Sequence, residues 1–104
     1  MITTPIQTPE RTRLAIYNQA LLESSIERQV MHLSEETSEL MVEISHLIRG
    51  RTSNPKDVAL EIADVMVMLD LFRHLLGIRS EDVRAAIDAK LEKFRTQLKS
   101  PPEI

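Results

Sequence analysis

The sequence predicts an all-α protein of four helices packed as a bundle, and three observations support this class. Of the 104 residues only two are glycine and 3% are aromatic, whereas leucine, isoleucine, alanine and glutamate are common. This composition favours helices over sheets. Capping residues, prolines and glycines divide the chain into four segments of helical length. Apolar residues recur with a helical period, most clearly in the second segment.

The first two helices begin at recognisable capping signals. Thr8 followed by Pro9 predicts a helix over residues 9–22, because proline is favoured in the first helical turn. Ser24, with a glutamate three residues later, forms a capping box that opens a second helix over 25–49. An arginine in the last turn and the glycine after it predict where this helix ends.

The last two helices follow the same rules. Asn54 and the proline after it predict a third helix over 55–76, which ends before a glycine. Ser80 and two acidic residues open a fourth helix over 81–98. Two adjacent prolines cannot continue a helix, so residues 99–104 are predicted to form a loose tail.

Length, charge and composition exclude several classes of protein. The chain has the length of one domain, 1–104. Its net charge of −3 argues against a nucleic-acid polymer as partner, since such proteins carry a basic excess. The absence of cysteine excludes disulfides and thiolate sites. No apolar run could span a membrane, and the first residues lack the pattern of a signal peptide, which predicts a cytoplasmic protein without a membrane partner.

The third helix is apolar on almost every face. Residues 58–76 read VALEIADVMVMLDLFRHLL. Such a helix has to be covered on all sides, and three other short helices of one chain are too few to do so. The pattern therefore predicts a homodimer or homotetramer with this helix at its centre. The short loop before it predicts that the second and third helices are antiparallel neighbours.

Four carboxylates fall on these two helices in pairs spaced by three residues. Glu36 and Glu39 share a face of the second helix, and Glu61 and Asp64 interrupt the apolar third helix. Burying an ionised carboxylate is costly unless its charge is neutralised. Four such groups facing one another would repel unless a cation bridges them. Mg²⁺ and Mn²⁺ prefer ligand sets made only of oxygens, so the pattern predicts a metal site.

Two alternatives to a metal site stay open. The glutamates of the second helix are also consistent with an ordinary solvated face. Buried ion pairs could satisfy the carboxylates of the third helix, although Lys56, Arg73 and His74 lie towards its ends. Glu43 and His46 match one Glu-x-x-His element of a di-iron bundle, but such a site needs two elements and the sequence has no second.

The acidic residues form two motifs that resemble a known family signature. Glu35, Glu36 and Glu39 make an EExxE motif, and Glu61 and Asp64 make an ExxD motif. Two such motifs at this separation resemble the signature of the MazG-type all-α nucleoside triphosphate pyrophosphohydrolases. The resemblance covers most of the chain, including the run EIADVMVML and a fourth helix that carries lysines.

The resemblance implies Mg²⁺-dependent hydrolysis of a nucleoside triphosphate, of either sugar, between its α and β phosphates. It assigns metal binding to four carboxylates: Glu36, Glu39, Glu61 and Asp64. Activation of the attacking water falls to Glu35 or Glu39, so all five acidic residues are candidate catalytic residues. Substrate binding falls to three further residues: Gln29, Lys90 and Lys93.

A second interpretation is a catalytically inactive helical module that serves in assembly or regulation. It needs the same helices but no metal. Phe94 stands where many family members have asparagine, and only three aromatic residues are available to stack on a base. The base and the sugar of the substrate are therefore left undefined.

Overall fold

The computed structural model describes residues 6–51 and 54–103, which contain four helices and no strand. The helices are α1 (Glu10–Glu23), α2 (Ile26–Ile48), α3 (Pro55–Leu75) and α4 (Ser80–Gln97). The predicted all-α class is confirmed. Each helix begins and ends within one residue of the range that its capping signals predict. Residues 52 and 53 of the predicted loop and the last residue of the predicted tail lie outside the described residues.

The connection between α1 and α2 differs from the prediction by one residue. α1 continues through Glu23, and the Ser24 N–H closes its last turn by donating to the Ala20 carbonyl at 3.0 Å. Ser25 is therefore the cap of α2, and its Oγ accepts from the Arg28 N–H at 3.1 Å. The prediction that Ser24 caps α2 is wrong, because α1 runs one residue longer than expected and Ser24 belongs to the turn that ends it.

The starts of α3 and α1 are made differently. Asn54 caps α3 as predicted, since its Oδ1 accepts from the Lys56 N–H at 2.9 Å and the Asp57 N–H at 3.1 Å. α1 has no side-chain cap, because Pro9 rather than Thr8 occupies the cap position. The side chain of Asn54 thus satisfies donors that the first turn of α3 leaves without a partner.

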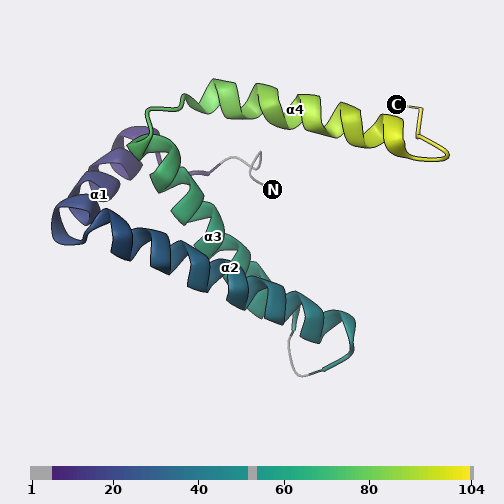
Figure 1. Ribbon diagram of the computed structural model, residues 1–104, viewed down its shortest axis with the longest axis horizontal. Coiled ribbons are helices and arrows are strands. Elements are labelled where there is room, and N and C mark those ends of the chain that lie inside the picture. Colours follow the sequence, from purple (N-terminus) through teal and green to yellow (C-terminus); the bar gives the residue numbers. More distant parts are fainter. Residues whose placement is uncertain (1–5, 52–53, 104) are drawn as a thin grey trace.

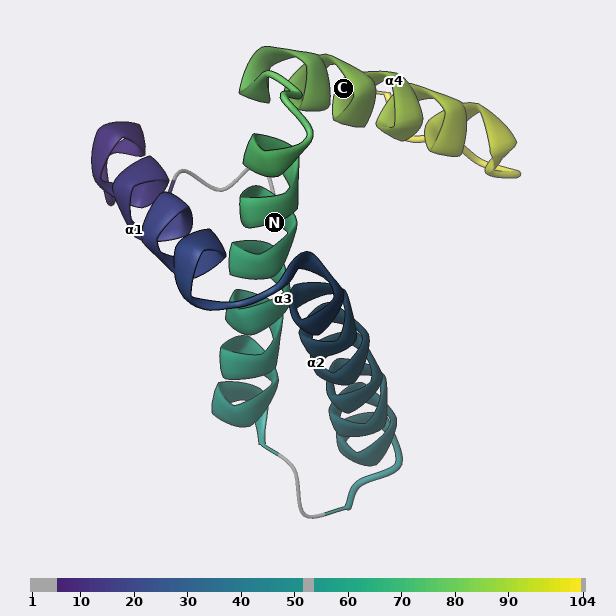
Figure 2. The ribbon, with the colours of Figure 1, turned by 60° about the vertical axis from the view of Figure 1, so that its left-hand side comes forward.

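α2 and α3 form an antiparallel hairpin, which is the most extensive packing in the chain (Figure 1). α1 lies against the other side of α3, so that α3 is the middle helix of the three (Figure 2). Gly50 and Gly77 follow α2 and α3 with φ of +70° and +69°, values that glycine adopts without steric penalty. The predicted antiparallel neighbours are confirmed.

α4 makes no extended contact with the other helices and leads away from the end of α3 (Figure 1). Its apolar side chains stay exposed, as Leu91 and Phe94 illustrate. The four helices of one chain therefore do not close into a bundle, and any bundle that includes α4 requires a different placement of α4 or further chains.

The hydrophobic core of the single chain is small. Among the described residues only Tyr17, Met68 and Leu71 are buried apolar side chains. The chain exposes 8271 Å², whereas a folded monomer of 11.9 kDa exposes about 6,000 Å². Its radius of gyration is 16.2 Å, compared with about 13 Å for a compact chain of this length. Although this surface is partly apolar, none of the described helices combines the length and hydropathy needed to cross a membrane.

Candidate metal centre

Three of the four predicted metal ligands converge at the seam between α2 and α3. Glu36 and Glu39 lie about one turn apart on α2, and Glu61 faces them from α3. One carboxylate oxygen of each residue lies within 4.8 Å of the other two. The antiparallel packing of the hairpin causes this convergence, because it places the middle of α2 against the first half of α3 (Figure 1).

Two of the three carboxylates are partly withdrawn from water. Glu36 and Glu61 are half-buried, whereas Glu39 is exposed. The Oε2 atoms of Glu36 and Glu61 are buried and have no hydrogen-bond partner among the described residues. A buried carboxylate oxygen that accepts no hydrogen bond is unusual in a native structure.

The two half-buried glutamates have raised pKa values. Burial is the largest cause for the pKa of Glu36, followed by its hydrogen bonding with Asp64 and by the charge of Glu39. Burial also raises the pKa of Glu61 most strongly, and the charges of neighbouring carboxylates add to this rise, which outweighs the lowering effect of its hydrogen bonding with Glu36. The ionised cluster is therefore electrostatically unfavourable, and a bound cation would relieve the repulsion.

Asp64 and His32 lie at the edge of the cluster. Asp64 is exposed on α3 and interacts with Glu36, but it is outside the group of three converging oxygens. His32 Nε2 lies 3.9 Å from Glu36 Oε1. Within residues 6–51 and 54–103, no lysine or arginine forms an ion pair with Glu36, Glu39 or Glu61. The alternative of buried ion pairs with arginine or lysine thus finds no support at this cluster.

The structure places the other predicted site residues farther away. Glu35 is exposed on α2, outside the converging group. Gln29 is half-buried on α2, two turns before Glu36. Lys90 and Lys93 are exposed on α4, which makes no extended contact with α2 or α3. The single chain does not bring these two lysines to the carboxylates.

A hollow of about 280 Å³ opens beside the cluster and gives a ligand access to it. It is lined by Ser38, Glu39, Val42, Glu43 and Glu61. The candidate ligand atoms are all carboxylate oxygens. Glu36 and Glu61 each keep an unpaired buried oxygen, and Glu39 lines the hollow. These features fit a hard divalent cation such as Mg²⁺ or Mn²⁺.

Sequence reasoning missed a second polar cluster, which joins α1 to α3. The Asp70 carboxylate accepts hydrogen bonds from Tyr17 Oη at 2.7 Å, Arg13 Nε at 3.0 Å and Arg73 Nε at 3.0 Å. The Asp70 side chain keeps only 13% of its exposure. The sequence does contain a feature that points to this cluster: Asp70 is the third carboxylate inside the apolar run of α3, where an ionised group needs a partner. Because these three donors already occupy the Asp70 oxygens, the cluster holds α1 against α3, and we call Asp70 with its three partners the α1–α3 joint.

This joint changes the ionisation of both groups at its centre. Burial alone acts to raise the pKa of Asp70, but hydrogen bonds from Tyr17, Arg73 and Arg13 outweigh it and hold the pKa below its usual range. Burial and the adjacent Asp70 carboxylate raise the pKa of Tyr17 to about 12. The carboxylate is thus ionised and the phenol is neutral at neutral pH.

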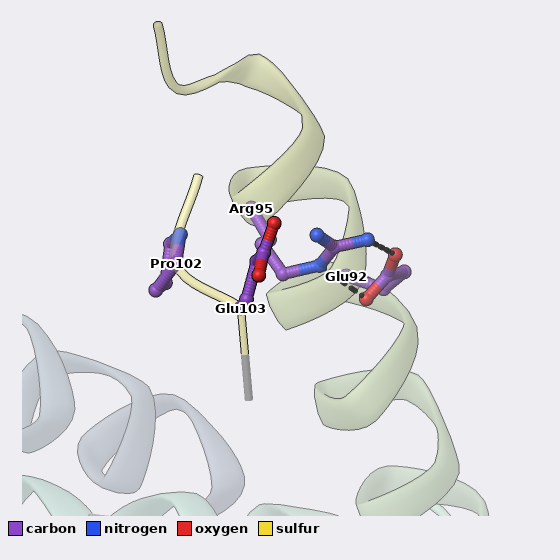
Figure 3. A pocket seen from close by; sticks show the side chains of 4 residues that line it. All are labelled: Glu92, Arg95, Pro102 and Glu103. Carbon is purple, nitrogen blue, oxygen red and sulfur yellow. Dashed lines mark hydrogen bonds and ion pairs between the residues drawn. The ribbon is translucent and has the colours of Figure 1, made fainter. Parts of the chain in front are cut away.

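Another hollow, of about 690 Å³, lies at the far end of α4 (Figure 3). It is lined by Glu92, Arg95, Pro102 and Glu103, and Figure 3 shows Arg95 paired with Glu92. None of the predicted site residues lines it. The α2–α3 seam therefore remains the candidate site.

Comparisons of the chain with protein-family models, with curated proteins and with solved structures find no match. The resemblance to the MazG-type enzymes therefore remains a prediction from the spacing of the two acidic motifs.

Proposed function

We propose that the chain is a Mg²⁺-dependent nucleoside triphosphate pyrophosphohydrolase, which converts a ribo- or deoxyribonucleoside triphosphate to the monophosphate and pyrophosphate. The observation that carries the proposal is the convergence of Glu36, Glu39 and Glu61 at the α2–α3 seam. The unpaired buried oxygens of Glu36 and Glu61 support a cation at this place. The EExxE and ExxD motifs support a nucleotide as the substrate.

The proposed metal ligands are Glu36, Glu39 and Glu61, with Asp64 at the edge of the same cluster. They would hold Mg²⁺, for which Mn²⁺ is a substitute of similar ligand preference. When bound, the metal supplies neutralisation of the phosphate charge and a lower pKa for the attacking water.

The remaining residues of the site have separate roles in the proposal. Glu39 is exposed beside the hollow, so its carboxylate can accept a proton from the attacking water. Glu35 lies outside the cluster and is the second candidate for this role. Gln29 shares the half-buried face of Glu36, from which its amide can donate to an oxygen of the substrate.

We also propose that the protein is a cytoplasmic homodimer or homotetramer. Lys90 and Lys93 would neutralise phosphate oxygens, but in the single chain α4 holds them away from the carboxylates. They would reach a site through movement of α4 or through another chain. The large exposed surface of the single chain supports assembly.

The test is release of pyrophosphate from the common ribo- and deoxyribonucleoside triphosphates with Mg²⁺, Mn²⁺ or EDTA. We expect release that depends on the metal, and we expect Glu61→Gln to lower kcat/KM by about 100-fold or more. Glu27→Gln is the matched control, because Glu27 is an exposed glutamate of α2 outside the cluster. Full activity in EDTA or in Glu61→Gln would exclude the assigned site.

The alternative is an inactive helical module that acts through protein contacts. The small core and the exposed apolar side chains of α2, α3 and α4 favour it. An inactive module would release no pyrophosphate from any nucleotide and would show no dependence on Mg²⁺. The acidic cluster would then be only a solvated edge of the hairpin.

A further inference from the structure

A histidine stands beside the three converging carboxylates, and the proposed set of ligands does not use it. The Nε2 atom of His32 lies 3.9 Å from Oε1 of Glu36. This separation is too long for a hydrogen bond, and 52% of the His32 side chain is exposed, so the ring is free to turn. Asp64, the fourth ligand that the sequence predicts, lies outside the converging group. Three oxygens leave the coordination of a divalent cation incomplete, so a further ligand can join them.

Helix geometry places His32 on the same face of α2 as two of the carboxylates. At 100° per residue, His32, Glu36 and Glu39 fall within an arc of about 60°. His32 and Glu36 are one turn apart, and two side chains spaced by four residues on a helix can hold one metal ion. Side chains on a helix also lean towards its N-terminus, so both glutamates lean towards the turn that carries His32. The His32 ring therefore lies on the side of α2 where the oxygens converge.

The distance between His32 and Glu36 matches that between two ligands of one ion. Carboxylate oxygens and imidazole nitrogens bind a transition metal at about 2.0–2.2 Å, so two ligand atoms on one ion lie about 3–4 Å apart. The 3.9 Å between Nε2 of His32 and Oε1 of Glu36 falls within this range. The two atoms can therefore bind one cation without a change in the backbone of α2.

An imidazole ligand changes which metal such a site prefers. Mg²⁺ takes ligand sets made of oxygens and keeps several of its waters, whereas imidazole nitrogens suit transition metals. Three carboxylate oxygens and one imidazole nitrogen form a mixed set. Because Mn²⁺ accepts both kinds of ligand and Mg²⁺ favours oxygen alone, the mixed set favours Mn²⁺.

We propose that His32 is the fourth protein ligand of the metal site between α2 and α3, and that the site therefore binds Mn²⁺ in preference to Mg²⁺. The inference rests on the proposed function of the three glutamates and adds the identity of the metal. The other two histidines of the chain are placed differently. His46 lies about two turns beyond Glu39 on α2. The Nε2 atom of His74 is hydrogen-bonded to Asn18 of α1 at 2.9 Å.

The test is pulsed electron paramagnetic resonance of the full chain loaded with Mn²⁺ alone, without nucleotide. A nitrogen bound directly to Mn²⁺ couples to the electron spin of the metal, so we expect a nitrogen coupling in the wild type. His32→Gln should lose this coupling, because glutamine offers an amide oxygen in place of the imidazole nitrogen. His46→Gln is the matched control and should keep the coupling, since it removes the second histidine of the same helix.

Calorimetric titration with each metal supplies a second measurement. We expect the wild type to bind Mn²⁺ more tightly than Mg²⁺. His32→Gln should lower the Mn²⁺ affinity by about 10-fold and leave the Mg²⁺ affinity nearly unchanged. An equal loss for both ions would show that His32 acts only as a charge beside Glu36, and would overturn the proposal. A wild type that binds no Mn²⁺, or a nitrogen coupling that survives in His32→Gln, would overturn it as well.

The controls separate this inference from unfolding and from the hydrolase. Circular dichroism reports whether His32→Gln keeps its helices, and His32→Ala is the second variant if it does not. Mn²⁺ bound through oxygens alone would exclude His32 from the site and leave the three carboxylates as the ligands. Nitrogen coupling without any release of pyrophosphate would leave His32 as a ligand and exclude the hydrolase.

Discussion

At the scale of single residues, the two buried polar clusters are satisfied in different ways. The Asp70 carboxylate receives three hydrogen bonds from α1 and α3, whereas the Oε2 atoms of Glu36 and Glu61 receive none within the part of the chain that the structure describes. The pKa of Asp70 is therefore lowered, and the pKa values of the two glutamates are raised. Asp70 holds two helices together, while the glutamates offer unpaired oxygens to a ligand.

Mg²⁺ is expected to stabilise the folded protein, because only the folded chain brings the carboxylates together. At a free Mg²⁺ concentration 100 times Kd the gain is about 2.7 kcal/mol, measurable as a higher Tm by calorimetry and reversed by EDTA. Glu61→Gln should lose most of this gain and Glu27→Gln should keep it. If both variants respond like the wild type, Mg²⁺ acts elsewhere on the protein.

Asp70→Asn should destabilise the fold by about 2–3 kcal/mol, because it removes the carboxylate charge that pairs with the half-buried guanidinium groups of Arg13 and Arg73. The lowered pKa of Asp70 means that the folded state binds this proton less tightly than the unfolded state. The contribution is thus complete above the unfolded pKa of about 4 and is lost as the pH falls through the lower folded value.

Urea denaturation of the wild type and Asp70→Asn at pH 7 and at pH 3 measures this contribution. The difference between the two proteins should shrink in acid. Asp88→Asn, at an exposed aspartate of α4, is the control and should change stability by less than about 0.5 kcal/mol. A difference that grows in acid would show that the joint does not depend on the ionised carboxylate.

At the scale of elements, the helices differ in what holds them. α2 and α3 hold each other over an extensive contact, whereas α1 contacts α3 more briefly, around Tyr17 and Asp70. α4 has neither kind of support within the chain. Because most helical stability in proteins comes from packing of the apolar face, α4 is the helix that the single chain stabilises least.

The cap of α2 provides a test at this scale. Ser25→Ala removes the side-chain acceptor of the Arg28 N–H and should cost about 1 kcal/mol of unfolding free energy. Ser24→Ala removes a side chain that caps no helix and should change stability by less than about 0.5 kcal/mol. Thermal denaturation of the two variants distinguishes the caps. A larger loss of stability in Ser24→Ala than in Ser25→Ala would show that Ser24 is the cap of α2.

At the scale of the whole molecule, the single chain is extended and has few buried residues. Its exposed surface and radius of gyration both exceed those of a compact monomer. Since folding free energy comes mainly from burial of apolar surface, the proposed assembly would supply stability that so small a core does not provide.

The Tm is therefore expected to rise with protein concentration, because dilution favours the dissociated and less stable chain. Calorimetry over a hundredfold range of concentration, in EDTA to remove any contribution of metal, measures the rise. A constant Tm in the wild type would mean that the single chain is stable by itself.

Local signals made most of the fold predictable. Asn54 and the two glycines end or begin helices through contacts within a few residues, so their effects are visible in the sequence. Ser24 and Ser25 were harder to separate, because the choice depends on where α1 stops. Asp70 was overlooked because its partners Arg13 and Tyr17 lie more than fifty residues away in the chain.

The sequence by itself determined the helical class, the helix bounds to within a residue and the spacing of the acidic pairs, since these depend on short-range propensities and capping. Only the tertiary structure decided that Glu36, Glu39 and Glu61 converge with Asp64 at their edge. It also decided that α4 stands away from them. Those outcomes depend on how the helices pack, and helix packing is set by contacts between residues far apart in the chain.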